Sequence, residues 1–410
     1  MKIGVVGLGY VGIVTAAVLA DKGNDVIGVD ISAERVEALR KGPTPIYEPG
    51  LKEMLERNSN RLEFSSDYAR LRGAAAVFIV VPTPTLNGKI NLSYVKDAAG
   101  RVAAVEKSAV LVIKSTVVPG TARELRARTG LKVVSNPEFT SEGNGVRDTL
   151  EPSRVIIGSA EKKPGDLVEE IWSFAKSPVI RTNNENAELI KYASNAFLAT
   201  KISFINEIAN LCERIPGCDV DVIAKGMGLD RRIAPYFLKA GIGYGGSCFP
   251  KDTNALASFA REKGERMSVI EAAIKVNEER IDRVIEHIRS SVKDIHGKRI
   301  GVLGAAFKED TDDVRESQAV RLMERLGKEK AIVVAYDPMA KSIPVPGVMR
   351  VGSVKECVEG SDVVVVATEW PQFRKIGQMA GRKPVIDARR VLDRNDFKNF
   401  RAIGLGNDED

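Results

Sequence analysis

A single cysteine follows a glycine-rich run in the stretch GIGYGGSCFPKD, residues 241–252. Cys248 is followed by Lys251 and Asp252, so a sulfur, an ammonium and a carboxylate lie close together in the chain. Two interpretations compete: a tight turn that buries an inert thiol, or a pocket whose thiol is a nucleophile. A helix that begins near Phe249 would favour the thiolate and place Asp252 one turn after Cys248, on the same side of the helix.

A second candidate site lies at the start of the chain, in MKIGVVGLGYVG. Gly7, Gly9 and Gly12 form a G-x-G-x-x-G pattern between an apolar strand and a helix, which is typical of a turn that holds a dinucleotide pyrophosphate. Asp30 ends the next strand, where a carboxylate would bind the adenosine ribose and repel a 2′-phosphate. The pattern favours NAD over NADP, although Arg35 nearby could tolerate that phosphate. The alternative is a tight turn that binds nothing.

The elements around these residues are expected in three blocks. Up to about residue 180, apolar strand-like runs alternate with helical stretches, which indicates a parallel sheet covered on both faces. Helical spacing of apolar residues then extends over about thirty positions from residue 186, longer than a usual globular helix. Strand patterns return at KRIGVLGAAF.

We therefore predict an α/β protein with two Rossmann-like doubly wound domains joined by a central helical region that contains one long helix. The predicted boundaries are 1–182 for the first, NAD-binding domain, 183–292 for the helical region and 293–410 for the second Rossmann-like domain. Residues 407–410 are expected to form a frayed tail.

The composition is that of an ordinary globular enzyme. Of 410 residues, 44% are hydrophobic and 28% charged, and the formal net charge is +6. No Lys/Arg block is interleaved with aromatics, so no nucleic-acid partner is expected, while a modest positive surplus suits an anionic small molecule. The chain enters a strand at once, which leaves no room for a signal peptide, and no apolar run approaches the roughly 20 residues of a membrane span.

The cysteines and histidines limit the chemistry. Cys212, Cys218, Cys248 and Cys357 lack the short paired spacing of a zinc site, so no metal is expected, and reduced thiols in the cytoplasm fit the pattern. All except Cys248 are interpreted as inert. The two histidines lie far from any motif, so the chemistry is expected to use Cys, Lys, Asp, Glu and Thr.

Six motifs resemble, in order, those of the UDP-glucose/GDP-mannose dehydrogenase family. They are GLGYVG, KSTVVPGT, NPEFTSEG, KYASNAFLATKISFINE, GYGGSCFPKD and FKEDTDDVRES. The resemblance covers essentially the whole chain, and NPEF followed by EG, with GGSCFPKD, is most similar to the members that oxidise UDP-glucose. It implies an NAD-dependent four-electron oxidation of UDP-glucose to UDP-glucuronate. The alternatives are the same chemistry on UDP-N-acetylmannosamine or GDP-mannose, and a nucleotide-sugar-binding protein that has lost catalysis.

The resemblance implies a chemical role for the Cys248 thiol. A cysteine can hold the intermediate aldehyde as a thiohemiacetal, and a second oxidation gives a thioester that water hydrolyses. Lys191 and Asn195, four apart on the long helix, would face the substrate, although either could instead cap a surface turn. Lys191 would stabilise oxyanions. The catalytic residues implied by the resemblance are Cys248, Lys191, Asn195, Asp252, Glu138 as a water-assisted acid/base, and Thr116 near the nicotinamide.

The resemblance also implies binding residues. Those for the cofactor are Gly7, Gly9, Val11, Gly12, Asp30, Arg35, Thr83, Thr116, Glu142, Lys251 and Arg315. Those for the substrate are Phe139, Thr140, Ser141, Glu142, Lys191, Asn195, Arg232, Phe237, Leu238, Lys239, Ala240, Gly241, Gly245 and Lys308. One of Arg389 and Arg390 is expected to contact the uridine nucleotide.

Arg232 matches an arginine that reaches a neighbouring subunit's site, which implies a homodimer, formed through the central long helix. Two features depart from the family pattern. Thr140 and Ser141 stand where a more apolar pair is common, which leaves the choice of sugar open, and Arg35 stands where a lysine is common.

Overall fold

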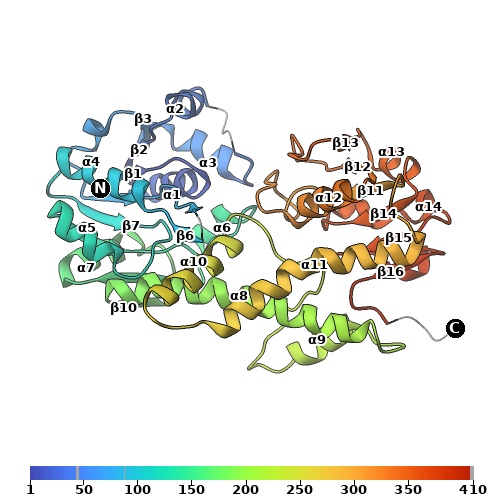
Figure 1. The fold of residues 1–410 in the computed structure, drawn as a ribbon. Coiled ribbons are helices and arrows are strands. Elements are labelled where there is room, and N and C mark those ends of the chain that lie inside the picture. Colours follow the sequence, from blue (N-terminus) through green and yellow to red (C-terminus); the bar gives the residue numbers. More distant parts are fainter. Residues whose placement is uncertain (43–45, 87, 407–410) are drawn as a thin grey trace. The chain divides into compact units, whose positions relative to one another are not determined.

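The computed structural model describes residues 1–42, 46–86 and 88–406, so the predicted frayed tail lies outside the described residues. The chain divides into two compact units, Met1–Ser194 and Asn195–Asp410. The boundary falls inside the helix α8 (Asn184–Cys212), the long helix that the sequence predicts (Figure 1). The division into three domains stays a prediction.

The first unit is built on an eight-stranded sheet with the order β10-β9-β8-β7-β4-β1-β2-β3. Its strands are β1 (Lys2–Val6), β2 (Asp25–Val29), β3 (Leu62–Ser65), β4 (Ala76–Ile79), β7 (Val110–Ile113), β8 (Lys132–Ser135), β9 (Val155–Ser159) and β10 (Val179–Thr182). Neighbouring strands are parallel except β8 and β9, which pair antiparallel, so the sheet is mixed where the sequence predicted a parallel one. A two-stranded hairpin, β5 (Thr85–Leu86) and β6 (Lys89–Ile90), stands apart from it.

Helices cover both faces of this sheet because successive strand residues point to opposite sides. Phe78 and Val112 pack in one apolar cluster with residues of α1, α2, α3, α6 and α7, whereas Ile79 and Leu111 pack in another with residues of α4, α5 and η2. These helices are α1 (Tyr10–Asp21), α2 (Ala33–Arg40), α3 (Leu51–Arg57), α4 (Ser93–Val105), α5 (Thr121–Thr129), α6 (Gly145–Leu150) and α7 (Lys162–Ile171), with the 3₁₀ turns η1 (Ser59–Arg61) and η2 (Tyr68–Leu71).

The second unit has a six-stranded, wholly parallel sheet with the order β13-β12-β11-β14-β15-β16. Its strands are β11 (Arg299–Leu303), β12 (Ile332–Tyr336), β13 (Met349–Arg350), β14 (Val363–Val366), β15 (Val385–Asp387) and β16 (Phe400–Ala402). Side chains on one face pack with α11 (Ser268–Val292) and α12 (Gln318–Lys328), and those on the other with α13 (Val354–Glu359), α14 (Gly377–Ala380) and η3 (Pro371–Lys375). A further 3₁₀ turn, η4 (Arg394–Asp396), precedes β16. Both sheets confirm the predicted pair of Rossmann-like folds.

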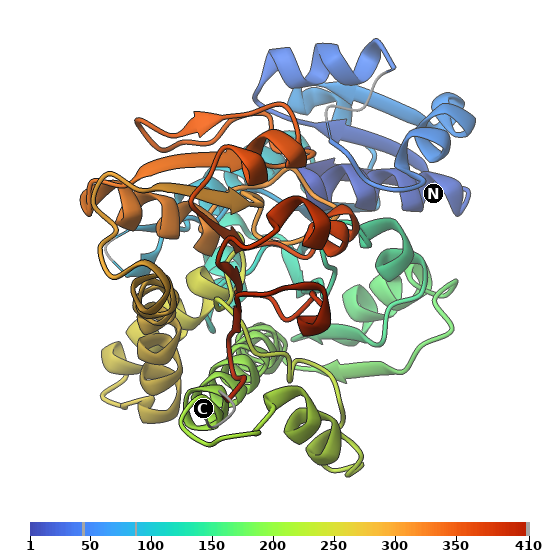
Figure 2. The same cartoon turned by 90° about the vertical axis from the view of Figure 1, so that its right-hand side faces the viewer.

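The helical part of the second unit contains the rest of α8, α9 (Val220–Gly228), α10 (Phe249–Glu262) and α11. Figure 2 shows the last described segment, in dark red, running from the sheet to the end of α8. There the N–H of Gly404 donates to Glu213 Oε1 at 2.9 Å, and the N–H of Val220 donates to the Gly404 carbonyl at 3.0 Å. This segment therefore fastens the helices to the sheet.

Candidate active site

The glycine turn after β1 has the geometry of a dinucleotide site. Gly7 has a φ of +96°, and a Cβ on Gly12 would lie 1.8 Å from the Gly7 carbonyl oxygen, so neither position accepts a side chain without a shift. Gly9 is the N-cap of α1 and supplies no side-chain cap, so the N–H groups at this helix start are not capped by it. The turn thus fits a pyrophosphate bound at the N-terminus of α1.

Asp30 closes this turn from the end of β2. One carboxylate oxygen accepts the N–H of Leu8 at 2.8 Å, and the other accepts the N–H of Ser32 at 2.8 Å. Arg35 pairs with Asp30 at 3.0 Å, so the guanidinium that could tolerate a 2′-phosphate is already held by the carboxylate that disfavours one. Val11 lies in the first turn of α1, and Thr83 is buried after β4.

A buried ion pair lies at the carboxyl end of β8. Glu138 Oε1 lies 2.9 Å from Lys191 Nζ, and Oε2 accepts both the N–H and the hydroxyl of Thr140 at 2.6 Å. Burial alone would raise the pKa of Glu138, but Lys191 and Thr140 lower it to about 2. At neutral pH this side chain is therefore a carboxylate, as a charge partner of Lys191 must be.

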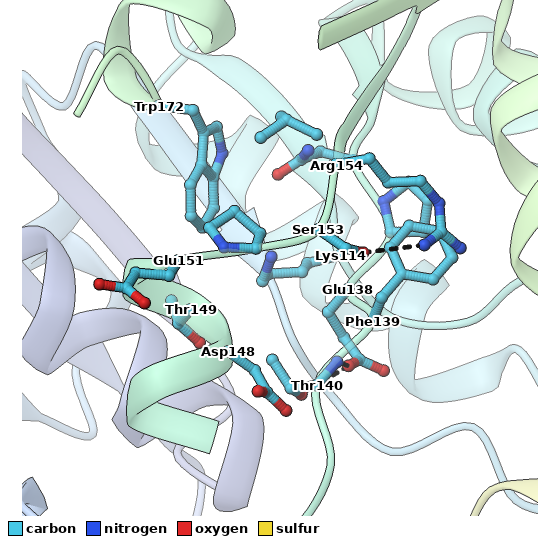
Figure 3. A pocket seen from close by; sticks show the side chains of 14 residues that line it. Lys114, Glu138, Phe139, Thr140, Asp148, Thr149, Glu151, Ser153, Arg154 and Trp172 are labelled. Carbon is cyan, nitrogen blue, oxygen red and sulfur yellow. Dashed lines mark hydrogen bonds between the residues drawn. The ribbon is translucent and has the colours of Figure 1, made fainter. Parts of the chain in front are cut away.

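A cavity of about 240 Å³ lies beside this ion pair (Figure 3). Its walls include Glu138, Phe139, Thr140, Lys114, Arg154 and Trp172. The Lys114 ammonium lies 4.6 Å from the centre of the Trp172 ring, and the Arg154 guanidinium lies 3.8 Å from the centre of the Phe139 ring. Burial lowers the pKa of Lys114 to about 8, against the opposing effect of Glu138. Sequence reasoning missed both cations, although Lys114 opens the quoted motif KSTVVPGT.

The turn that carries Glu142 is tied to the glycine turn by a network that sequence reasoning also missed. The N–H of Gly143 lies 3.0 Å from both the Tyr10 hydroxyl and Glu48 Oε2, and the N–H of Val146 donates to Glu48 Oε1 at 3.2 Å. The Tyr10 hydroxyl in turn donates to Glu48. The next residue before Glu142, Ser141, is held by Asp148 through its N–H and hydroxyl. The turn that carries Glu142 is thus tied to Tyr10 at the start of α1, to Glu48 and to Asp148.

In the second unit the predicted nucleophile starts a helix. Cys248 is the N-cap of α10 and is exposed, whereas Cys212 and Cys357 are buried. The N–H of Asp252 donates to the Cys248 carbonyl at 2.8 Å, which places the carboxylate one helical turn after the thiol, as the sequence predicts. Asp252 is fully buried; Asn195 Nδ2 donates to its Oδ2 at 2.6 Å, and Lys251 forms an ion pair with its Oδ1. Lys251, predicted to contact the cofactor, thus also contacts Asp252.

The glycines before Cys248 allow close backbone contacts. A Cβ on Gly245 would lie 2.2 Å from the Glu316 carbonyl oxygen, and the N–H of Gly241 donates to Asn206 Oδ1 at 2.9 Å. Leu238 and Ala240 are buried, whereas Phe237 is partly exposed and packs edge-on against Phe249.

The predicted basic contacts have carboxylate or aromatic neighbours in this unit. Arg232 pairs with Asp230, Lys239 with Glu369 and Arg315 with Asp313, while Lys308 lies 5.9 Å from the centre of the Phe307 ring.

The structure distinguishes Arg389 from Arg390. Arg390 is held in a double ion pair with Asp219 and Asp221. The Arg389 guanidinium donates to the carbonyls of Ala367, at 2.9 Å, and Phe307, at 3.0 Å, and its pKa is lowered by burial. Arg389 has no ion pair among the described residues, whereas Arg390 has two, so Arg389 is the better candidate for the uridine nucleotide.

The predicted residues thus form two groups, each within its own unit. Thr116, Glu138, Glu142, Lys191 and the glycine turn belong to the first unit, and Asn195, Cys248, Lys251 and Asp252 to the second. Among the described residues, no group of three His, Cys, Asp or Glu side chains is placed to hold a metal ion. Nor does any described helix have the length and apolar character needed to cross a bilayer.

Comparisons with known proteins cover nearly the whole chain. Three models of the UDP-glucose/GDP-mannose dehydrogenase family match: the NAD binding domain at residues 1–176, the central domain at 185–279 and the UDP binding domain at 301–394. The UDP-glucose 6-dehydrogenase YwqF of Bacillus subtilis is 40% identical over 99% of this chain and 96% of its own length.

Two solved structures are similar over 98% of this chain. A UDP-glucose dehydrogenase from Pyrobaculum islandicum is 36% identical, with a TM-score of 0.94 and 98% of its chain covered. A UDP-D-ManNAc dehydrogenase from Pyrococcus horikoshii is 31% identical, with a TM-score of 0.89 and 99% of its chain covered.

Proposed function

Because the chain belongs to the UDP-glucose/GDP-mannose dehydrogenase family, we propose that it oxidises UDP-glucose to UDP-glucuronate with two molecules of NAD. Family membership itself gives the class, an NAD-dependent oxidoreductase that acts on a UDP-sugar. The sugar and the covalent route are the proposal. They draw support from the relatives named for UDP-glucose and from the residues around Cys248.

The observation that carries the proposal is the Asp252 network. Asp252 is a fully buried carboxylate one turn after the exposed Cys248 at the N-cap position of α10, and it is held on one oxygen by Asn195 and on the other by Lys251. A purely structural thiol needs no such carboxylate, because an inert cysteine packs as a small apolar group. A thioester does need one, since its hydrolysis requires an oriented, partly deprotonated water.

The reaction then divides among residues of this chain. The sulfur of Cys248 adds to the aldehyde carbon, and the carbonyl oxygen takes up a proton to give a thiohemiacetal. Loss of a second hydride and that proton gives the thioester. Water then adds to the thioester carbon, the C–S bond breaks and the thiol is restored. Overall the alcohol, one water and two NAD give a carboxylate, two NADH and three protons.

The first unit supplies binding and electrostatics. The turn that runs from Gly7 to Gly12 would hold NAD, which would supply the hydride acceptor for both oxidations. Lys191 stabilises negative charge on the substrate oxygen, and its release from Glu138 leaves that carboxylate able to accept a proton through water. Lys191 keeps Glu138 ionised while the ion pair is formed. Glu138 can therefore act as an acid or a base only when the Lys191 ammonium has turned away from it.

NADH formation against a panel of nucleotide sugars tests the proposal. We expect UDP-glucose to give the highest kcat/KM and two NADH per sugar consumed, with no free aldehyde in solution. One NADH per sugar, with aldehyde released, would contradict the covalent route, whereas activity confined to another sugar would contradict the substrate.

UDP-N-acetylmannosamine is the second candidate substrate. Thr140 and Ser141 offer hydroxyls where a more apolar pair is common, and the Pyrococcus horikoshii relative is named for UDP-D-ManNAc. Both hydroxyls already have acceptors within the chain, Glu138 and Asp148, which leaves less polar capacity for an N-acetyl group. The sugar panel includes this compound.

We also propose a homodimer formed through α8. Phe197, Phe204 and Leu211 lie seven residues apart on this helix and have exposed fractions of 64%, 45% and 58%. Such a heptad stripe is typical of a helix that packs on a second helix. We expect a dimer in sedimentation analysis of the full chain and a monomer for Phe204→Glu; a monomeric wild type would contradict the proposal. Arg232, 89% exposed in its side chain, remains the candidate that reaches the partner's site.

A further inference from the structure

Glu188 is a buried carboxylate in the first-unit part of α8 and was assigned no role from the sequence. The residue is 3% exposed. Its Oε2 accepts the N–H of Gly120 at 2.7 Å, and its Oε1 accepts the N–H of Ala122 at 2.9 Å and the hydroxyl of Ser135 at 3.1 Å. The carboxylate is therefore satisfied by the start of α5 and the end of β8.

These contacts replace a helix cap. Gly120 is the N-cap of α5 and has no side chain to accept the N–H groups of the first turn. Glu188 supplies the missing acceptor from another helix, where its negative charge also complements the dipole of α5. The start of α5 is thus fixed to α8 by a charged group.

The loop held in this way carries Thr116. It runs from the end of β7 to α5, and at its beginning the Ser115 hydroxyl donates to the Val81 carbonyl at 2.7 Å. At its other end, Glu188 binds Gly120 and Ala122. Thr116 therefore lies in a short segment that is anchored on both sides, and only the second anchor belongs to the helix of Lys191.

A small cavity of about 10 Å³ lies between Thr116, Glu188 and Lys191. It is lined by Thr116, Val117, Ser135, Pro137, Glu188 and Lys191, among others. A space of this size accepts about one water, which needs two to four polar partners. The hydroxyls of Thr116 and Ser135, the Glu188 carboxylate and the Lys191 ammonium are of the types that such a water binds.

We propose that Glu188 is a positioning residue for the oxidation: from α8 it fixes the Thr116 loop relative to Lys191, across a space that holds one water. The role rests on the proposed function, since it matters to catalysis only if Thr116 and Lys191 act on the substrate. Burial disfavours the charged form and raises the pKa of Glu188 to about 7, although the N–H groups of Ala122 and Gly120 lower it. The carboxyl group is held by two backbone N–H groups and one hydroxyl, and no ion pair to Glu188 is found among the described residues, which fits a role in geometry.

The test compares Glu188→Gln with Glu185→Gln in the full-length protein. Glu185 lies one turn earlier and is partly exposed; its carboxylate lies 3.6 Å from Arg123 of α5, so the control removes a carboxylate and a looser, exposed contact between the same two helices. An amide can offer its oxygen to only one of the two N–H groups. We expect hydrogen exchange of the Gly120 and Ala122 amides to rise about tenfold or more in Glu188→Gln, as for the loss of one such bond.

We further expect kcat in Glu188→Gln to fall about tenfold to a hundredfold while both KM values change less than about threefold, because a displaced Thr116 affects the reacting geometry more than binding. Glu185→Gln should match the wild type in both measurements. Unchanged exchange, or raised exchange with a wild-type kcat, would overturn the proposal.

If Glu188→Gln does not fold, Ser135→Ala removes one of the three donors and should give a smaller change in the same direction. A wild type inactive on UDP-glucose would refute the proposed function alone, since the exchange measurement needs no substrate, and kcat would then be measured on the sugar it does oxidise.

Discussion

The first strand of each sheet, β1 and β11, is followed by the same glycine turn, but the aspartate beside the turn has different hydrogen-bond partners in the two units. Gly7 after β1 and Gly304 after β11 have φ values of +96° and +104°, and each donates its N–H at 2.8 Å to the end of the neighbouring strand. An aspartate follows that strand in both units, Asp30 in the first and Asp337 in the second. The backbone of the dinucleotide turn is therefore present twice.

The aspartates differ in what they bind. Asp337 accepts five N–H groups: those of Ala305 and Ala306 and the Trp370 indole on one oxygen, and those of Met339 and Ala340 on the other. Within the described part of the chain, Asp30 accepts two backbone N–H groups, besides the Arg35 guanidinium. The Asp30 carboxylate can therefore still accept hydrogen bonds from a ribose. The acceptor positions of the Asp337 carboxylate are occupied by N–H groups of the protein itself. A shared turn thus does not imply a shared ligand.

The largest effect should come from a residue in neither turn. Cys248→Ser keeps the volume and a hydroxyl, but an alkoxide is a poorer leaving group than a thiolate, so we expect kcat to fall by about three orders of magnitude or more. Sugar should accumulate covalently at residue 248, as seen by intact-protein mass, while NAD and UDP affinities stay unchanged. Normal turnover of the folded variant would refute the nucleophile.

Gly12→Ala should come next. A Cβ there meets the Gly7 carbonyl at 1.8 Å, so the turn must shift and NAD affinity should fall about a hundredfold, with UDP affinity unaffected. Gly9→Ala is the matched control for stability, because a Cβ at Gly9 meets nothing within 4 Å in the chain itself. If Gly12→Ala lost NAD affinity and UDP affinity equally, the conclusion that the two glycine turns serve different ligands would be wrong.

Exchanging the acids for amides tests the comparison directly. Asp337→Asn sets an NH₂ group against N–H donors in a buried site and should lower the free energy of unfolding by about 3 kcal/mol. Asp30→Asn should cost less stability, because fewer donors lose their acceptor, and should reduce the preference for NAD over NADP about tenfold. Urea denaturation and kcat/KM with both cofactors measure this pair. If Asp30→Asn lost more stability than Asp337→Asn, Asp30 rather than Asp337 would be the aspartate that mainly holds its own turn.

The last effect concerns the pH dependence of stability and Lys114, in the first unit. Its pKa is lowered by burial from 10.5 to about 8, so the folded state disfavours the charged form. Between these two values the unfolded chain binds more protons, so this group makes stability rise as the pH rises from 8 to 10.5. Lys114→Met should remove that rise and stabilise the protein at pH 7. An unaltered pH profile of unfolding would show that Lys114 is not desolvated.

The sequence predicted the parts that depend on local patterns. The two sheets, the long helix and the start of α10 follow from periodicity and turn residues. It did not predict that β9 runs antiparallel to β8, because an apolar run such as RVIIGS has no direction. Nor could it find Glu48 or Glu188, since most of their partners are backbone N–H groups far along the chain, which leave no signal of residue type.

The position of α8 has a consequence for how the protein is made. Synthesis proceeds from the N-terminus, and all eight strands of the large sheet are complete by Thr182. Glu188 and Lys191 follow only afterwards, yet they supply the acceptor for α5 and the counter-charge of Glu138. A nascent chain that ends at residue 182 therefore carries an uncapped helix and a buried carboxylate without its partner. The first unit is expected to reach its final stability on the ribosome only once the early turns of α8 have left the exit tunnel.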